Sequence, residues 1–446
     1  MSATATQLNK RNELLVRWAE SRSMTDDLFC RVRTDALYDR PIPERHRIVF
    51  YIGHLEAFDW NLIAGQALGL GPAHAEFDRL FAFGIDPVGG GLPTDQPADW
   101  PRLAEITAYN LRVRDELDRI VSNDLQAQAG HWRYPRDLVL NVAIEHRLMH
   151  AETLAYMLHQ LPTEQKVAPP DYRPIASSQP GPPIVARVIN IPAGTATLGM
   201  PRGRNLFGWD NEFEKQSVEV PAFAIDIHKV TNGQFLNFVR EGGYDEPRFW
   251  SDSAWAWIKE QNIGHPRFWH ERQGQWFYQG MFEAAPLPLD WPVYVSQAEA
   301  EAYARFAGKS LPTEAQFHRA AYGTPEGGER AFPWGEEPPE TGRGNFDFAR
   351  WDPAAVGSYP AGRSAFGIED ALGNGWEWTS SVFAPLPGFE PFLFYPGYSA
   401  NFFDGKHYVM KGASPRTAAC MLRRSFRNWF QPHYPFVYAS FRCVGN

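Results

Sequence analysis

The stretch Glu145-His146-Arg147-Leu148-Met149-His150-Ala151-Glu152 lies within an otherwise apolar segment of the chain. No Pro or Gly interrupts residues 138–158, and the apolar residues recur at steps of three and four, which predicts a helix. Two histidines four residues apart share one helix face, where both imidazoles can reach a single metal ion. The alternative is a pair of histidines satisfied within a helical core. The spacing therefore indicates a candidate metal site that needs further ligands.

The composition places the chain among globular proteins. Its 446 residues predict two or three domains, with 44% hydrophobic and 21% charged residues. A net charge of −9 without a long Lys/Arg block argues against nucleic acid as the main partner. No apolar run approaches the roughly 20 residues that span a bilayer, and the first residues lack the apolar core of a signal peptide. Three cysteines cannot form a disulfide framework, so we expect a cytoplasmic protein without a membrane partner.

The N-terminal part is helical in pattern, and we assign it to a first domain, residues 1–162. Four long helices with mostly short connections predict an antiparallel bundle, which places metal sites on its facing inner surfaces. The expected helices cover residues 7–33, 44–68, 101–123 and about 134–158.

The composition and the pattern of the sequence change between the two halves of the chain. Residues 163–184 are rich in Pro and read as an extended linker. Residues 185–446 alternate short β-like runs with Gly, Pro and Asn turns, and two helices are expected at 232–241 and 296–307. The predicted fold class is therefore α+β, with a helical bundle followed by a mixed domain.

A third metal ligand is expected in the second helix. His54 occupies the centre of a helix that is apolar on nearly all sides. Glu56 or Asp59 could supply a carboxylate instead, although their spacing from His54 puts them on other helix faces. Three neutral imidazoles leave positions open for substrate and dioxygen, and they suit iron, zinc or copper. Glu145 or Glu152 could bind the free N–H of a ligand.

Two resemblances cover nearly the whole chain. The segment Gly53-His54-Leu55-Glu56-Ala57-Phe58-Asp59-Trp60-Asn61, with His146, His150 and Glu152, resembles the DinB-like half of the ergothioneine-synthesising sulfoxide synthases. The second half resembles the formylglycine-generating-enzyme (sulfatase-modifying-factor) fold, a C-type-lectin-like architecture. The matching runs are Lys229-Val230-Thr231-Asn232-Gly233-Gln234-Phe235, Leu311-Pro312-Thr313-Glu314-Ala315, Phe332-Pro333-Trp334-Gly335, Gly373-Asn374-Gly375-Trp376-Glu377-Trp378-Thr379, Arg427-Asn428-Trp429 and Ser440-Phe441-Arg442-Cys443.

The resemblance implies a mononuclear non-heme Fe(II) enzyme with O₂ as co-substrate. Such enzymes join a chalcogen donor to C2 of the imidazole of hercynine, the trimethylammonium betaine of histidine. His54, His146 and His150 match the three iron ligands of the family. Trp376 and Glu377, in contrast, are expected to belong to the framework of the fold.

The resemblance also implies residues that meet the substrate. Tyr395 matches a tyrosine that works as acid or hydrogen-bond donor, and Tyr398 matches a tyrosine of the substrate site. Asn428 and Trp429 match residues that hold the betaine. A quaternary ammonium has no proton to donate, so its recognition depends on aromatic faces and long-range charge.

Three positions depart from the ergothioneine enzymes. Residues 81–86, which include Phe83, replace a Tyr-Tyr-containing loop, and Met149 stands where the best-known bacterial form has Gln. Phe430 replaces an Asp that grips the amino group of the thiol donor, which removes a charge partner and adds an apolar surface. This pattern resembles the selenoneine synthases, whose donor is a selenosugar, and we take that branch as the leading interpretation.

Four other functions are considered. An ergothioneine-type sulfoxide synthase would use cysteine or γ-glutamylcysteine as donor. A formylglycine-generating oxidase needs a pair of nearby cysteines before the Arg-Asn segment, where Cys420 stands alone. A non-catalytic lectin-like module would bind a ligand or partner without chemistry. A thiol transferase, common among DinB-like bundles, could account only for the first half of the chain.

Overall fold

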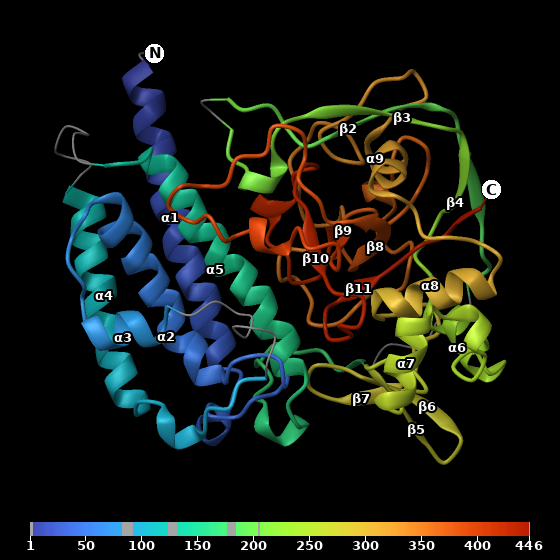
Figure 1. Ribbon diagram of the computed structural model, residues 1–446, viewed down its shortest axis with the longest axis horizontal. Helices are drawn as coiled ribbons and strands as arrows, with labels where there is room; N and C mark the ends of the chain where they lie inside the picture. The colour runs from blue at the N-terminus through green and yellow to red at the C-terminus, as the bar shows by residue number, and fades with distance from the viewer. Residues whose placement is uncertain (1–2, 83–91, 124–131, 176–183, 204–205, 446) are drawn as a thin grey trace. The chain divides into compact units, whose positions relative to one another are not determined.

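The computed structural model describes residues 3–82, 92–123, 132–175, 184–203 and 206–445, with side chains from residue 13 onward. The chain divides into two compact units, Met1–Asp171 and Tyr172–Asn446. The first unit is helical, and the second combines short helices with small sheets (Figure 1). The Pro-rich segment expected as a linker, residues 163–184, spans the point of division.

Long helices build the first unit (Figure 1). They are α1 (Ala3–Phe29), α2 (Ile48–Asp59), α4 (Leu103–Asn123) and α5 (Arg136–His159), and a short α3 (Ala75–Leu80) follows α2 in the chain. Helix α1 packs along α5, and α2 packs against α4 and α5. The predicted helical character of this half is confirmed, while its DinB-like identity stays a prediction.

The burial pattern explains why these helices associate. Helix α4 buries one stripe of apolar side chains at steps of three and four, namely Ile106, Tyr109, Val113, Leu117 and Val121. Helix α5 is buried on nearly all sides from residue 139 onward, because its apolar residues cover most of its surface. Each fully buried aliphatic side chain contributes about 1.5–3 kcal/mol. The two candidate histidines of α5 therefore lie inside the unit.

The second predicted helix, residues 44–68, differs from the expectation of one continuous α-helix. It begins at Ile48, and from Trp60 to Ala67 it continues as a π-helix, η2. Accordingly, the N–H of Leu68 donates to the carbonyl of Ile63, five residues earlier, at 3.1 Å. Such segments are rare and frequently lie at functional sites. The spacing of apolar residues in the sequence cannot reveal a π-helical segment, because α-helices and π-helices both bury closely spaced apolar residues.

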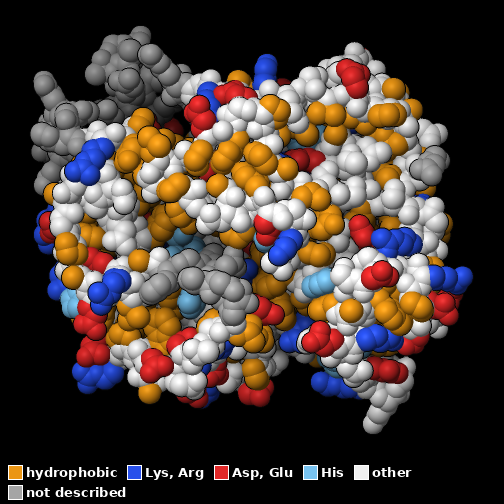
Figure 2. Space-filling view, viewed as in Figure 1, with side chains coloured by type: hydrophobic (Ala, Val, Ile, Leu, Met, Phe, Trp, Pro, Cys, Tyr) orange, Lys and Arg blue, Asp and Glu red, His pale blue; other side chains and the backbone are white. Residues whose placement is uncertain are grey.

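Two features of the described residues concern membranes and nucleic acids as possible partners. None of the described helices combines the length and the apolar character that crossing a membrane requires. On the face drawn in Figure 2, Lys and Arg side chains are interspersed with Asp and Glu side chains. The described basic side chains on this face thus form no continuous strip of the kind that follows a nucleic-acid backbone.

Small sheets dominate the second unit. One has the strand order β10-β9-β8-β11, formed by Asn428–Phe430, Tyr408–Ala413, Gly375–Val382 and Ala439–Ser440. Another has the order β1-β4-β12, formed by Val188–Ile191, Phe223–Asp226 and Val444–Gly445. The remaining strands are β2 (Gly194–Leu198), β3 (Gln216–Val220), β5 (Trp269–Arg272), β6 (Gln275–Gln279) and β7 (Ala284–Pro286).

Short helices connect these strands. They are α6 (Asn232–Arg240), α7 (Asp252–Glu260), α8 (Gln297–Phe306) and α9 (Glu314–Tyr322). Helices α6 and α8 confirm the two predicted helices, whereas α7 and α9 were missed. A capping signal marks α9, because Thr313 accepts a hydrogen bond from the N–H of Gln316 at 3.1 Å.

Strand β10 carries three of the predicted site residues. It pairs antiparallel with β9, with Trp429 opposite Val409, and stands at the edge of its sheet. Its side chains are half-buried for that reason. Strand β8, on the other side of β9, holds Glu377, which is buried and bound by Lys229 at 2.7 Å and by Arg442 at 2.6 Å. Glu377 is thus part of the framework that supports the sheet.

Candidate active site

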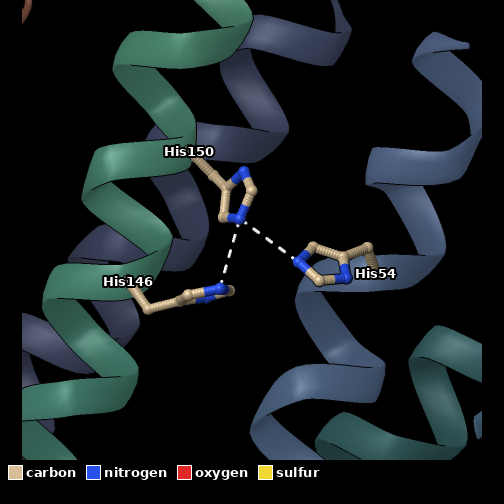
Figure 3. A group of neighbouring side chains, drawn as sticks. All are labelled: His54, His146 and His150. Carbon is tan, nitrogen blue, oxygen red and sulfur yellow. Dashed lines mark hydrogen bonds between the residues drawn. The ribbon is translucent and has the colours of Figure 1, made fainter. Parts of the chain in front are cut away.

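Three histidines of the first unit converge on one point (Figure 3). His146 and His150 lie one turn apart on α5, and His54 faces them from α2. The Nε2 atom of His150 lies 3.2 Å from the Nε2 atom of His54 and 3.2 Å from that of His146. All three side chains are buried. The structure thus brings together the three residues that the sequence proposed as metal ligands.

Aromatic rings fix the planes of two of these imidazoles. Phe58 stacks on His146, with ring centroids 3.4 Å apart and planes 9° apart. Phe50 stacks on His54, with centroids 4.8 Å apart and planes 22° apart. Both phenylalanines belong to α2, whose nearly all-apolar sequence places them beside the cluster. Packing therefore orients the rings before any ion binds.

The tautomer of His54 follows from its second nitrogen. Its Nδ1 lies 2.7 Å from the carbonyl oxygen of Phe81. A carbonyl only accepts hydrogen bonds, so Nδ1 carries the proton and donates it. In the neutral ring, the lone pair then lies on Nε2, which faces the other two histidines. A carbonyl thus orients this imidazole, as commonly occurs for metal-binding histidines.

Burial keeps the cluster uncharged. It lowers the pKa of His54 to about 4, although the hydrogen bond to Phe81 opposes this shift. Burial and the neighbouring histidines also lower the pKa values of His146 and His150 well below the usual range for imidazole. Three neutral rings therefore meet at neutral pH, each able to offer a lone pair.

The nitrogen spacing fits one shared ion. Two nitrogens about 2.1 Å from a common metal ion and at roughly right angles to each other lie about 3 Å apart. The observed Nε2 separations of 3.2 Å match this value, and one ligand atom from each ring lies within 4.8 Å of the others. The donor set of three imidazoles suits iron, zinc or copper.

The carboxylates considered as alternative ligands have other partners. Glu56 accepts a hydrogen bond from Arg147 at 3.0 Å, and Asp59 accepts one from the same guanidinium at 2.8 Å. Both carboxylates are buried. Their engagement with Arg147 leaves His54 as the third candidate ligand of the cluster.

In the second unit, the two predicted tyrosines belong to an aromatic cluster. Tyr398 is buried and stacks on Trp209, with centroids 3.9 Å apart and planes 23° apart. Tyr395 is half-buried, and its ring centroid lies 5.7 Å from that of Tyr398. The hydroxyl of Ser399 donates to Asp210, which ties this loop to the segment that carries Trp209. Tyr398 is therefore held from behind by a fully buried ring.

Trp429 extends the same cluster. Its ring is perpendicular to Tyr398, with centroids 5.5 Å apart and planes 79° apart, and it stacks on Phe383 at 4.1 Å. Phe402 approaches Trp429 at 5.6 Å. Ring faces that meet at steep angles are the arrangement by which proteins bind quaternary ammonium groups. We call Trp209, Phe383, Tyr395, Tyr398, Phe402 and Trp429 the aromatic cluster.

The other residues of strand β10 flank this cluster. Asn428 is half-buried, and its side-chain oxygen accepts the N–H of Trp429 at 2.9 Å. Phe430 stacks on Tyr434, with centroids 5.2 Å apart and planes 8° apart, and Tyr434 meets the edge of Phe436 at 5.1 Å. Phe430 thus belongs to an aromatic wall of its own.

Two predicted residues stand apart from these groups. Met149 lies half-buried on α5 between the two histidines. Phe83 and most of the 81–93 loop lie outside the described residues, so its part in a substrate site stays a prediction.

Sequence reasoning missed Trp209 and Phe383. Both are buried, and both support a predicted site residue by stacking. Trp209 lies in Phe207-Gly208-Trp209-Asp210, a loop without periodicity, and Phe383 directly follows strand β8. The unusual number of aromatic residues was the only signal for them.

The fold and the two groups of residues define a class of protein. A helical unit holds a three-histidine cluster, and the second unit matches the sulfatase-modifying factor enzyme 1-like domain over residues 176–446. A hercynine oxygenase from Mycolicibacterium smegmatis is 37% identical over 444 residues, covering 95% of this chain and 98% of its own. The chain belongs to the ergothioneine sulfoxide synthase family, which is a family of enzymes.

Further relatives agree with this assignment. A hercynine oxygenase from Mycolicibacterium thermoresistibile is 38% identical over 406 residues, covering 88% of this chain and 85% of its own. Ergothioneine biosynthesis protein 1 from Neurospora crassa is 29% identical over 500 residues, covering 92% of this chain and 55% of its own.

Proposed function

We propose that this protein is a mononuclear non-heme Fe(II) enzyme that uses O₂ to form a carbon–chalcogen bond at imidazole C2 of hercynine. The observation that carries the proposal is the convergence of three buried, neutral imidazoles whose Nε2 atoms lie 3.2 Å apart in two pairs. His54, His146 and His150 would hold the iron. The similarity to hercynine oxygenases over nearly the full chain supports hercynine as substrate.

Iron in this cluster would supply the activation of O₂ that an oxidative coupling at an aromatic carbon requires. The protein supplies neutral ligands, so the ion keeps its positive charge in a buried site. The phenyl rings of Phe50 and Phe58 exclude water from the back of His54 and His146. The hydroxyl of Tyr395 would hold or deliver a proton during the reaction, as a positioned phenol can.

The aromatic cluster would bind the trimethylammonium group of hercynine. Trp429 and Tyr398 present ring faces at 79° to each other, and Trp209 and Phe383 hold these rings in place. Asn428 would orient the betaine through its amide. The buried carboxyl of Asp210, one residue from Trp209, adds a negative charge near the cation when it is ionised.

The donor is proposed to be a selenosugar, which would make the protein a selenoneine synthase. Phe430, which follows Trp429 on strand β10, stacks in parallel on Tyr434, and an aromatic wall suits the ring face of a sugar. An amino-acid thiol would instead need a charge partner, which Phe430 does not provide. A second candidate uses cysteine or γ-glutamylcysteine, and the similarity to ergothioneine biosynthesis protein 1 from fungi favours it.

A single-turnover assay distinguishes these donors. The full-length protein is loaded with Fe(II) without oxygen, mixed with hercynine and one donor, and exposed to O₂; products are identified by mass spectrometry. A C2–Se product from the selenosugar, well above any C2–S product, is expected. Turnover with thiols alone would overturn the selenium assignment. Consumption of neither donor would overturn the proposed reaction.

A further inference from the structure

A buried ion network joins the two helices that carry the three histidines. Arg147 of α5 donates from Nη1 to Glu56 at 3.0 Å and from Nη2 to Asp59 at 2.8 Å. The same Nη2 also donates to the carbonyl oxygen of Leu55 at 3.0 Å. All three side chains of the ion network are at most 1% exposed.

The ion network reaches the other helices of the unit through further contacts. Trp18 of α1 donates its indole N–H to Asp59 at 3.1 Å. Arg114 of α4 bridges Glu56 at 2.7 Å and Asp26 of α1 at 2.7 Å. Within the ion network, the contacts of Arg147 join α5 to α2.

The ion network and the histidine cluster use different faces of the same two helices. Successive residues of a helix are rotated by about 100°, so the direction of Arg147 differs by about 100° from that of His146 and by about 60° from that of His150. On α2, the direction of Glu56 differs by about 200° from that of His54. The helix pair is thus fixed at two separated places, by ion pairs on one face and by the three imidazoles on another.

Stability alone is a poor explanation for such a network. Removing charges from water costs several kcal/mol per ion, and apolar side chains of similar volume often stabilise a core equally well. Apolar packing, however, tolerates small shifts between helices. A slip of one residue moves a ligand by about 1.5 Å, while metal–ligand distances tolerate about 0.2 Å. The planar guanidinium donates from two nitrogens to two different carboxylates. It can keep both hydrogen bonds in only one register of α5 against α2.

We propose that Arg147 is a positioning residue that sets the register of α5 against α2 and thereby the spacing of the three histidines. This inference rests on the proposed metal binding by His54, His146 and His150. The contacts of Arg147 are structural. Their loss has a specific consequence, because a loss of register changes metal affinity in a protein that remains folded.

The test is a titration with Co(II), whose absorption spectrum reports ligand geometry. The variants are Arg147→Lys, which keeps the charge but loses the bidentate fork, and the triple variant Arg147→Met/Glu56→Gln/Asp59→Asn, which leaves no unpaired buried charge. Titrations are made well below the melting temperature of each variant. We expect Co(II) affinity to fall about 10–100-fold in both, with an altered visible spectrum.

The matched control is Asp118→Asn, which leaves Arg22 and its charge in place. Asp118 pairs with the buried Arg22 at 2.7 Å, and this pair joins α1 to α4, which carry none of the three histidines. The control should lose stability and keep Co(II) affinity and spectrum. Unchanged Co(II) affinity in Arg147→Lys and the triple variant would overturn the proposed role of Arg147. Absence of Co(II) binding by the wild type would instead overturn the proposed metal site, and with it this inference.

Discussion

The Nδ1 atom of His54 donates to the carbonyl oxygen of Phe81 at 2.7 Å, which leaves the Nε2 lone pair of His54 facing His150. This hydrogen bond joins two residues 27 positions apart in the chain. It sets both the tautomer and the orientation of one candidate ligand. Its environment therefore offers a way to disturb the metal site without changing a ligand.

Gly53→Ala should disturb this hydrogen bond. A Cβ atom at Gly53 would lie 2.5 Å from the ring of Phe81, which is fully buried and has little room to move. We expect metal affinity to fall about tenfold through the altered orientation of His54. The free energy of unfolding should fall by about 1–3 kcal/mol through overpacking.

Gly65→Ala is the control for this substitution. The nearest atom to a Cβ at Gly65 is a backbone oxygen at 3.9 Å, which is an ordinary contact. Metal titration and thermal unfolding of both variants measure the two effects. Normal metal affinity in Gly53→Ala would contradict the role assigned to the Phe81 carbonyl.

Trp429→Leu should weaken the binding of hercynine. A cation–π contact contributes about 0.5–2 kcal/mol, so the dissociation constant should rise about 2–30-fold. Calorimetric titration with hercynine and with histidine, which lacks the three methyl groups, separates recognition of the cation from recognition of the ring. Trp257→Leu, on helix α7 and stacked on His433, is the control. Equal losses in the two variants would argue against the aromatic cluster as the betaine site.

Asp210 should make the second unit less stable as the pH rises. Burial raises the pKa of Asp210 to about 6, although the hydrogen bond from Ser399 opposes the shift. A raised pKa stabilises the folded protein below the pKa of the unfolded chain, near 3.8, and this contribution is lost as the pH rises through about 6. Asp210→Asn removes the titration.

The measurement is urea unfolding of the wild type and Asp210→Asn between pH 4 and pH 7.5, followed by tryptophan fluorescence. The variant should gain stability relative to the wild type as the pH rises, by up to about 3 kcal/mol. Other carboxylates titrate in both proteins, so their effects cancel in the difference. A difference that does not change with pH would refute the raised pKa.

Much of the metal cluster was predictable from the sequence, because helical spacing is a local property. His146 and His150 share a face at any four-residue step, and His54 was conspicuous in an apolar helix. The contact between His54 and Phe81 was not predictable, because the segment after α3 is brought back only by the fold. The same holds for Tyr398 and Trp209, which stack across 189 positions of the chain.

The predicted fold was coarser than the observed one for a related reason. Long helices can be recognised from the sequence by their repeated apolar residues, and α1, α2, α4 and α5 were all expected. The short helices α7 and α9 and most strands contain too few periods to be recognised. The π-helix from Trp60 to Ala67 was predicted as a continuation of the α-helix. Its N–H groups donate to carbonyl groups one residue further back than in an α-helix, and the apolar pattern does not show this difference.

Phe430→Asp should change the choice of donor. An aspartate would provide a charge partner for the amino group of cysteine or γ-glutamylcysteine, and it would remove the ring that stacks on Tyr434. We expect the ratio of thiol to selenosugar turnover to rise at least about tenfold, measured by competition in one reaction mixture. Phe430→Leu should lose selenosugar turnover without gaining thiol turnover. Donor preference that is the same in all three proteins would show that Phe430 does not face the donor.

Iron binding by the histidine cluster is the central claim. Equilibrium dialysis against Fe(II) without oxygen, followed by elemental analysis, compares the wild type with His150→Ala and His159→Ala. His159 lies on the same helix and is also buried, but it is not part of the cluster. We predict stoichiometric iron in the wild type and in His159→Ala, and loss of the iron in His150→Ala. Equal iron content in all three proteins would contradict the account.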